Sequence, residues 1–217
     1  MKEYECTEEI FLKDIKNHKL NILKDDGIYR HLVFKRPDTN CYRFDIVTYL
    51  GYLVISGDMG CQVFSRLTDM FEFFRTDDRD FNKNRNGVLS INPSYWNEKV
   101  VSGNDNKEFS EKLLKKIVIE YIDSKLYDED WTEYEIDELK DDILADISYS
   151  DTNPVRMYDL INEYRFEGDS GKTFEFQDWL EYASSCQEYT FHYIWQCYAI
   201  AYAVQEYDTY KLGVVNE

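Results

Sequence analysis

A turn-like segment near the end of the sequence, GDSGKT at 168–173, contains residue types that could bind a phosphate or supply a nucleophile. A phosphate-binding loop needs a glycine five residues before Gly171, and Phe166 stands there. A serine nucleophile needs a matched histidine and carboxylate, and the whole chain has only 3 histidines. We therefore interpret the segment as a Gly-Asp turn between short strands.

A possible calcium-binding loop begins at Asp128. Together with Asp130 and Thr132 it supplies the first three ligand positions of such a loop, but the position that needs a sharp-turn glycine is Glu133. Thr132 and Glu135 also have the spacing of a capping box, which predicts a helix N-terminus at this point. The sequence therefore predicts no calcium site.

Cysteines and histidines are the other candidates for metal binding or catalysis. Cys186, His192 and Cys197 lie close in sequence, but their spacing matches no zinc motif, so we expect a core histidine and two buried thiols. His18 and His31 have no partner that the sequence reveals. With no nucleophile–base pair and no ligand spacing, we predict no catalytic residue, no metal and no cofactor, and we favour a binding protein over an enzyme.

The strongest signal is an acidic segment, DEDWTEYEIDELKDDILADISYSD at 128–151, which holds eleven carboxylates and one lysine. Like-sign pairs four residues apart on a helix, such as Asp137–Asp141, each cost roughly 0.2–0.5 kcal/mol. The segment nevertheless has helical apolar spacing. The predicted buried stripe is Ile136, Leu139, Ile143 and Ile147.

The acidic helix has two interpretations. It is a solvated face that keeps the protein soluble and monomeric, or its carboxylates imitate a phosphate backbone, which places one charge about every 3.4 Å along a strand. Interleaved aromatic residues would then anchor a protein partner, as they do at interface hot spots. These aromatic residues are Tyr121, Tyr127, Trp131, Tyr134 and Tyr149. The partner-binding residues that we predict are Trp131, Glu135, Asp137, Glu138, Asp141, Asp142 and Asp146.

The net charge of −18 is confined to the second half of the chain. Residues 1–119 contain 19 acidic and 19 basic side chains, whereas residues 120–217 contain 24 acidic and 6 basic ones. Such a chain would repel a nucleic acid, so we predict no direct nucleic-acid binding. The expected partner is a protein with a basic nucleic-acid-binding groove.

Composition limits the class of protein. A chain of 217 residues with 43% hydrophobic content can bury a core. The longest apolar run, 198–204, is too short to span a bilayer, and the charged first six residues do not form a secretory signal. Five cysteines without a Cys-x-x-Cys pair fit reduced thiols. We expect a cytoplasmic protein with no membrane interaction.

Periodicity predicts an α+β fold, with an N-terminal antiparallel β-meander and a mainly helical, strongly acidic C-terminal half. The predicted strands are 28–35, 41–48, 52–56 and 62–64. The predicted helices are 10–24, 67–75, 106–127, 132–147, 153–164 and 187–211, with a small hairpin at 166–176. Residues 193–204 are apolar nearly all round, so their helix should be central and buried. We predict a first region at 1–105 and a second at 106–217, packed as one compact unit.

Two stretches carry a resemblance: YRHLVFKRPDTNCYRFDIVTYLGYLVISGDMGCQVFSRLTDMFEFFR (29–75) and EYTFHYIWQCYAIAYAVQEYD (188–208). Their Arg-Pro turn, Ile-Ser-Gly-Asp-Met-Gly hairpin and Trp-x-Cys-Tyr-Ala helix resemble a family of small uncharacterised phage and prophage proteins. The likeness covers about 68 of 217 positions. The family has no assigned activity, so the resemblance implies no site residues.

The phage resemblance and the charge distribution together lead to a hypothesis of function. Small acidic phage proteins without catalytic residues are often inhibitors of host defence, so we expect a phage-encoded inhibitor of a CRISPR or restriction system. It would act by binding a nucleic-acid-handling protein, as a DNA mimic. Two alternatives stay open: an enzyme with a pocket between the sheet and the C-terminal helix, or a phage regulatory or scaffolding module. The sheet residues of that pocket would be Arg30, Asp45, Asp58 and Arg66.

Overall fold

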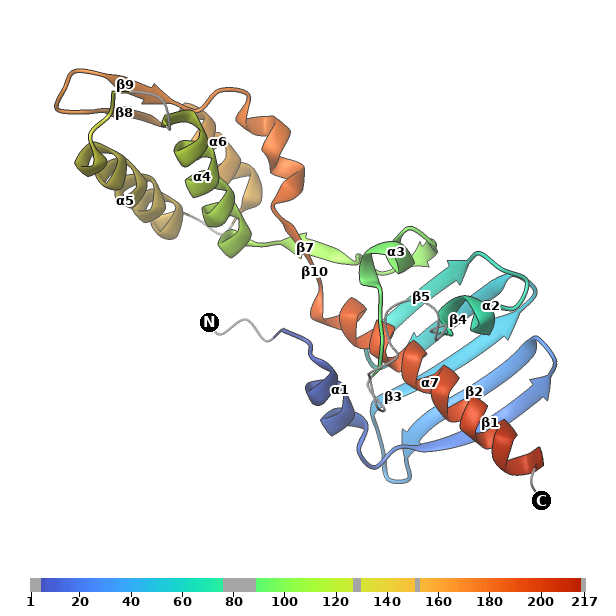
Figure 1. The fold of residues 1–217 in the computed structure, drawn as a ribbon. Coiled ribbons are helices and arrows are strands. Elements are labelled where there is room, and N and C mark those ends of the chain that lie inside the picture. Colours follow the sequence, from blue (N-terminus) through green and yellow to red (C-terminus); the bar gives the residue numbers. More distant parts are fainter. Residues whose placement is uncertain (1–4, 76–88, 127–129, 151–152, 216–217) are drawn as a thin grey trace. The chain divides into compact units, whose positions relative to one another are not determined.

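The computed structural model of the chain describes residues 5–75, 89–126, 130–150 and 153–215. Its α+β architecture confirms the predicted fold class. The chain forms two compact units (Figure 1). Unit 1 comprises residues 1–106 and 189–217, and unit 2 comprises residues 107–188. Unit 2 is therefore an insertion within the sequence of unit 1.

Unit 1 is built on a six-stranded antiparallel sheet in which the strands follow one another in chain order. The strands are β1 (Lys19–Asp26), β2 (Tyr29–Arg36), β3 (Thr39–Tyr49), β4 (Tyr52–Gly57), β5 (Gly60–Ser65) and β6 (Val100–Gly103). Strands β2 to β5 are the predicted meander. Strand β6 belongs to the stretch 76–105, in which the sequence shows no clear period, and it pairs with β5 through Val63 and Ser102.

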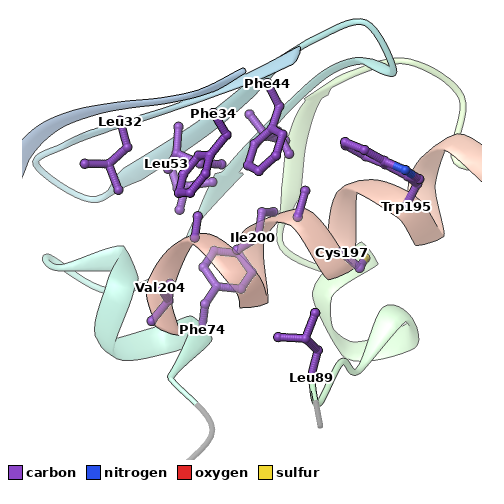
Figure 2. Packing of buried hydrophobic residues seen from close by; sticks show 14 of the residues in the cluster. Leu32, Phe34, Phe44, Leu53, Phe74, Leu89, Trp195, Cys197, Ile200 and Val204 are labelled. Atoms are coloured by element: carbon purple, nitrogen blue, oxygen red, sulfur yellow. The ribbon is translucent and has the colours of Figure 1, made fainter. Parts of the chain in front are cut away.

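One face of this sheet is apolar, and the long helix α7 (Phe191–Val215) packs on it (Figures 1 and 2). The side chains between the sheet and α7 include Leu32, Phe34, Phe44, Leu53, Trp195, Ile200 and Val204. Three short helices add buried aromatic residues to the same cluster. They are α1 (Glu8–Ile15), α2 (Met70–Phe74) and α3 (Pro93–Asn97). The prediction that residues 193–204 form a buried helix is confirmed.

The predicted helix over 10–24 is wrong in its second half. Helix α1 ends at Ile15, and β1 begins at Lys19. In β1 the half-buried Leu20 and Ile22 alternate with exposed side chains, which is the period of a strand. Two alternating apolar residues are too few to distinguish this pattern from a helical one in sequence.

Unit 2 is mainly helical and has its own hydrophobic core. Its elements are α4 (Glu111–Leu126), α5 (Glu133–Tyr149), α6 (Pro154–Glu163), the hairpin of β8 (Arg165–Glu167) and β9 (Thr173–Glu175), and the 3-10 helix η1 (Trp179–Ser185). The segment GDSGKT overlaps the β8–β9 turn, as predicted. The fully buried members of the core include Leu114, Val118, Ile122, Leu139, Ile143, Ile147, Ile161 and Trp179.

The chain passes between the units at two points, and the two passing segments pair with each other. Strands β7 (Lys107–Phe109) and β10 (Gln187–Tyr189) form a two-stranded sheet. The predicted boundary after residue 105 lies one residue from the structural one, but residues 189–217 belong to unit 1, where the prediction had grouped them with the second region. The physical reason is that α7 covers the apolar face of the N-terminal sheet.

Replacing Ile200 by Ala should lower the free energy of unfolding by about 2–5 kcal/mol, because this fully buried side chain fills the space between α7 and the sheet. Chemical denaturation measures the change. The control is Leu23→Ala, which truncates a side chain that is 58% exposed and should change the stability little. A loss below about 1 kcal/mol for Ile200→Ala would show that the helix is peripheral to the core.

Candidate partner-binding face

The charge asymmetry of the sequence coincides with the structural division. Residues 107–188, which are unit 2, contain 23 Asp and Glu against 9 Lys and Arg, a net charge of −14. The rest of the chain therefore carries only −4 of the total −18. A compact unit with its own core holds most of the excess charge, so the surface of unit 2 is where an electrostatic function would reside.

Two predicted partner-binding residues, Trp131 and Glu135, lie in the interior of unit 2. The Glu135 side chain is only 2% exposed, and the Trp131 ring packs in the core cluster of the unit. Both stand at the N-terminus of α5, where Thr132 is the N-cap of a capping box. The structure therefore gives them a role in folding, and it removes them from the accessible face.

Glu135 joins the start of α5 to the β8–β9 turn. Its Oε2 accepts hydrogen bonds from the backbone N and from Oγ1 of Thr132 at 3.0 and 2.8 Å, and its Oε1 accepts one from the backbone N of Ser170 at 2.9 Å. The backbone N–H of Thr132, followed by that of Ser170, lowers the pKa of Glu135 from 4.5 to about 2. A Cβ at Gly168 would approach Oε1 of Glu135 to 2.7 Å and Cζ3 of Trp131 to 2.9 Å, so a larger residue here would have to displace these side chains.

Five of the predicted acids are exposed, and three of them, Asp137, Glu138 and Asp141, form one group with Glu133 one turn earlier. None of these four carboxylates forms an ion pair with any residue that the structure describes. The lysine among them, Lys140, binds Asp123 of α4. At 1.5 Å per residue, the stretch 133–141 spans roughly 12 Å of helix axis. We call these four acids the α5 acidic row.

Asp142 and Asp146 are exposed but lie at the edge of α5 beside Tyr164 at the end of α6. The Tyr164 hydroxyl donates a hydrogen bond to Oδ2 of Asp142 at 2.8 Å. Burial, followed by the hydrogen bond to Asp142, raises the pKa of Tyr164, so the hydroxyl stays a donor at neutral pH. Asp142 therefore contributes to the packing of α5 against α6 as well as to the charge of the surface.

Exposed tyrosines lie at both ends of α5. Tyr134 is 68% exposed and Tyr149 is 90% exposed, so both are available to a partner. Tyr121 is buried in the core, and its ring contacts Trp179. Tyr127 lies outside the described residues. Of the aromatic residues predicted as anchors, the structure leaves Tyr134 and Tyr149 on the surface with the α5 acidic row.

The residues named for an enzymatic pocket do not come together between the sheet and α7. Arg30 donates two hydrogen bonds of 2.8 Å to Asp69. Asp45 and Asp58 line a pocket of about 320 Å³. Asp45 lies between Phe44 and Ile46, which face the core, so alternation along β3 directs its side chain away from α7.

The described residues include no group of three or more His, Cys, Asp or Glu side chains that could hold a metal ion. Cys186 is buried in the core of unit 2 and Cys197 in the core of unit 1, as expected for buried thiols. The expectation of a core histidine is wrong, because His192 is exposed at the start of α7. Sequence reasoning also missed the contact of His31 Nε2 with Asp45 Oδ2 at 3.0 Å, which depends on strand register.

No protein-family model, curated protein or solved structure matches the chain. The resemblance to phage proteins stays a prediction. In the described part of the chain, no helix combines the length and apolar character needed to cross a membrane.

Replacing Glu135 by Gln should destabilise the protein at neutral pH, because a neutral amide cannot accept the Thr132 and Ser170 hydrogen bonds as strongly as a carboxylate. The folded-state pKa of about 2 lies below the ordinary 4.5, so the carboxylate stabilises the fold above pH 4.5, and this contribution is lost as the pH falls toward 2. Urea unfolding across this range should show the two proteins converging. A difference that stays constant with pH would contradict the role assigned to the carboxylate.

Proposed function

We propose that this protein binds the basic nucleic-acid-binding groove of another protein through the α5 acidic row and thereby excludes nucleic acid from that groove. The observation that supports the proposal is the row itself: four solvent-facing carboxylates at Glu133, Asp137, Glu138 and Asp141, with no ion-pair partner among the described residues. A helix selected for stability alone would place lysines opposite such acids.

The spacing of the row matches the charge density of a nucleic-acid strand. Four negative charges lie along roughly 12 Å of helix axis, and a DNA strand carries one charge per roughly 3.4 Å, or three to four over the same length. A groove whose lysines and arginines are arranged for phosphates would therefore meet a similar number of charges on α5. Tyr134 and Tyr149 add large exposed side chains of the type found at interface hot spots.

Binding of this kind separates partner recognition from folding. The side chains that hold α5 in place are Leu139, Ile143 and Ile147, which are fully buried on the opposite side from the row. The acids of the row are thus free to make charge-assisted contacts with arginines and lysines of a partner. Association would be fast at low salt and would weaken as salt screens the charges.

The finer form of the proposal is a phage-encoded inhibitor of a host defence system, of CRISPR or restriction type, that acts as a DNA mimic in the bacterial cytoplasm. The support for this form is the sequence resemblance to phage and prophage proteins. The second line of support is the net negative charge of unit 2. This charge disfavours direct contact with nucleic acid and favours contact with the proteins that bind nucleic acid.

The double replacement Glu138→Lys and Asp141→Lys tests the row. It converts the like-sign pairs Asp137–Asp141 and Glu138–Asp142 into opposite-sign pairs, so the helix should keep or gain a few tenths of a kcal/mol in stability. The same change places two positive charges where the partner groove is positive, so binding should be lost. Thermal unfolding and binding are measured on the same preparation.

The matched control is Asp159→Lys with Glu163→Lys, which reverses two exposed acids about one helical turn apart on α6. The two double variants change the net charge of unit 2 equally, so a general electrostatic effect would weaken partner binding in both. The proposal predicts that the α6 double retains binding. Equal loss of partner binding in the two double variants would show that the total charge of unit 2, and not the α5 acidic row, determines binding.

The partner is identified by affinity capture from a bacterial lysate followed by mass spectrometry, with the α5 double variant as the comparison. A supporting result is a nucleic-acid-binding protein that wild type retains, that duplex DNA and added salt displace, and that the α5 double does not retain. If retained proteins are insensitive to competing DNA, the groove proposal is wrong.

A further inference from the structure

We propose that the pocket over β3 and β4 of unit 1 is a binding site for a small molecule that carries an oxyanion, a phosphate or a carboxylate, with Arg43 as its principal ligand-binding residue. The pocket has a volume of about 320 Å³ and is lined by Asn40, Arg43, Asp45, Ser56, Gly57 and Asp58. This volume is within the range of small-molecule sites. The site is separate from the α5 acidic row and does not depend on the function proposed for it.

The pocket lies at a distortion of β3. Between the register pairs Phe34–Phe44 and Arg36–Thr39, β2 contributes one residue and β3 contributes residues 40–43. Within this bulge Tyr42 has a φ of 58°, in the left-handed region that non-glycine residues rarely adopt. Bulges of this kind occur next to binding and active sites, where they redirect side chains.

Contacts on both sides hold the bulge in its unusual conformation. The backbone N of Tyr42 donates a hydrogen bond to Oδ2 of Asp58 at 2.8 Å, and the Tyr42 ring stacks on Trp195 of α7 with centroids 6.1 Å apart. The backbone N of Asp58 donates to the carbonyl oxygen of Arg43 at 2.9 Å. The main chain on both sides of the pocket is therefore fixed before any ligand arrives, which reduces the entropic cost of binding.

Arg43 is fixed along one edge and open along another. Its Nε and Nη2 donate hydrogen bonds to Oδ1 and Oδ2 of Asp45, both at 3.0 Å, and His31 Nε2 contacts the same Oδ2. Two of the five guanidinium N–H groups are thus used, and the other three have no partner among the described residues. These include Nη1, which together with the second N–H of Nη2 forms a fork suited to two oxygens of a phosphate or carboxylate.

The neighbouring strands add positive charge on the same face. Lys19 and Lys35 are register partners on β1 and β2, and like charges in directly opposite positions destabilise a sheet. Both are exposed, and within the described chain neither has an ion-pair partner. Phe34 and Phe44 are register partners in the core between the sheet and α7. Lys35 follows Phe34 and Arg43 precedes Phe44, so alternation places both cations on the side of the sheet away from α7. Lys19, the register partner of Lys35, lies on the same side.

The remaining lining residues define the rest of the ligand. Ser56 lies opposite Asp45 on β4 and, with the Asn40 amide, offers neutral hydrogen-bond donors to the oxyanion. Asp58 uses Oδ2 for Tyr42 and keeps Oδ1 as an acceptor. The ligand that fits this arrangement carries an anionic group for Arg43 and a hydroxyl or amino group for Asp58.

Isothermal titration calorimetry with inorganic phosphate, adenosine 5′-monophosphate and succinate tests the site, with adenosine as the uncharged comparison. Binding of phosphate or the nucleotide identifies a phosphate site, and binding of succinate alone identifies a carboxylate site. Arg43→Gln should lower the affinity for the probe that binds about tenfold or more, because it removes the charge-assisted hydrogen bonds of the guanidinium. Failure of all three anions to bind at millimolar concentration would overturn the proposal.

Arg43→Gln also removes the contact with Asp45 and could affect folding, so two further variants separate an effect on binding from an effect on folding. Lys35→Ala removes an exposed cation that forms no ion pair in the described structure. It should therefore lower the affinity for the anionic probe severalfold without changing thermal stability. Arg66→Gln removes one positive charge from an exposed position of unit 1 outside the pocket and should leave binding unchanged. Equal weakening by Lys35→Ala and Arg66→Gln would show attraction by net charge alone and would exclude a defined site.

Discussion

The contact between α7 and the apolar face of the sheet is the constraint on which unit 1 depends. Strands β2 to β5 place large apolar side chains on one face, and α7 supplies Trp195, Ile200 and Val204 to cover it. This helix comes after the 82 residues of unit 2 in the sequence. Closing such a long connection is tolerable because the entropic cost rises by only about 0.6 kcal/mol for each doubling of its length. The paired strands β7 and β10 also hold its two ends together.

The insertion explains how the chain carries so much charge in one place. Unit 2 has its own core, so the acids of α5 do not need to satisfy any packing demand of the sheet. Each like-sign pair on α5 costs a few tenths of a kcal/mol, whereas each buried Leu or Ile side chain contributes about 1.5–3 kcal/mol. The apolar stripe of Leu139, Ile143 and Ile147 therefore outweighs the repulsion, and the charge pattern is free to serve recognition.

Local patterns predicted the strands of the meander, the start of α5 and the buried character of α7, because alternation, a capping box and continuous apolar sequence each act over a few residues. They failed where partners are distant in sequence. The stretch that forms β6 has no period of its own and becomes a strand only by pairing with β5. In the same way, the return of α7 to unit 1 depends on strands β1 to β5, which end more than a hundred residues earlier.

The candidate surface on α5 could be recognised in sequence, although two of its residues were assigned the wrong role. Thr132 and Glu135 have the spacing of a capping box, and the glutamate of such a box turns back toward the cap. Trp131 occupies the position before the cap and Ile136 the fourth helical position, the pair that forms a hydrophobic staple; Trp131 belongs to the core cluster, and the partly buried Ile136 packs against it. Charge alone suggested exposure at Glu135, but helix-end geometry determines its burial.

The pocket on unit 1 could not be predicted from sequence, because register and a bulge create it. Arg43, Asp45 and His31 meet only once β2 and β3 are paired, and Arg43 takes its position from the left-handed Tyr42 beside it. Such a backbone conformation costs of order 1–3 kcal/mol. The Asp58 hydrogen bond and the packing of the Tyr42 ring on Trp195 offset this cost, and both partners come from other elements of unit 1. The helix that completes the hydrophobic core therefore also supports the strained strand beneath the pocket, so the integrity of the pocket depends on the same contact as the fold.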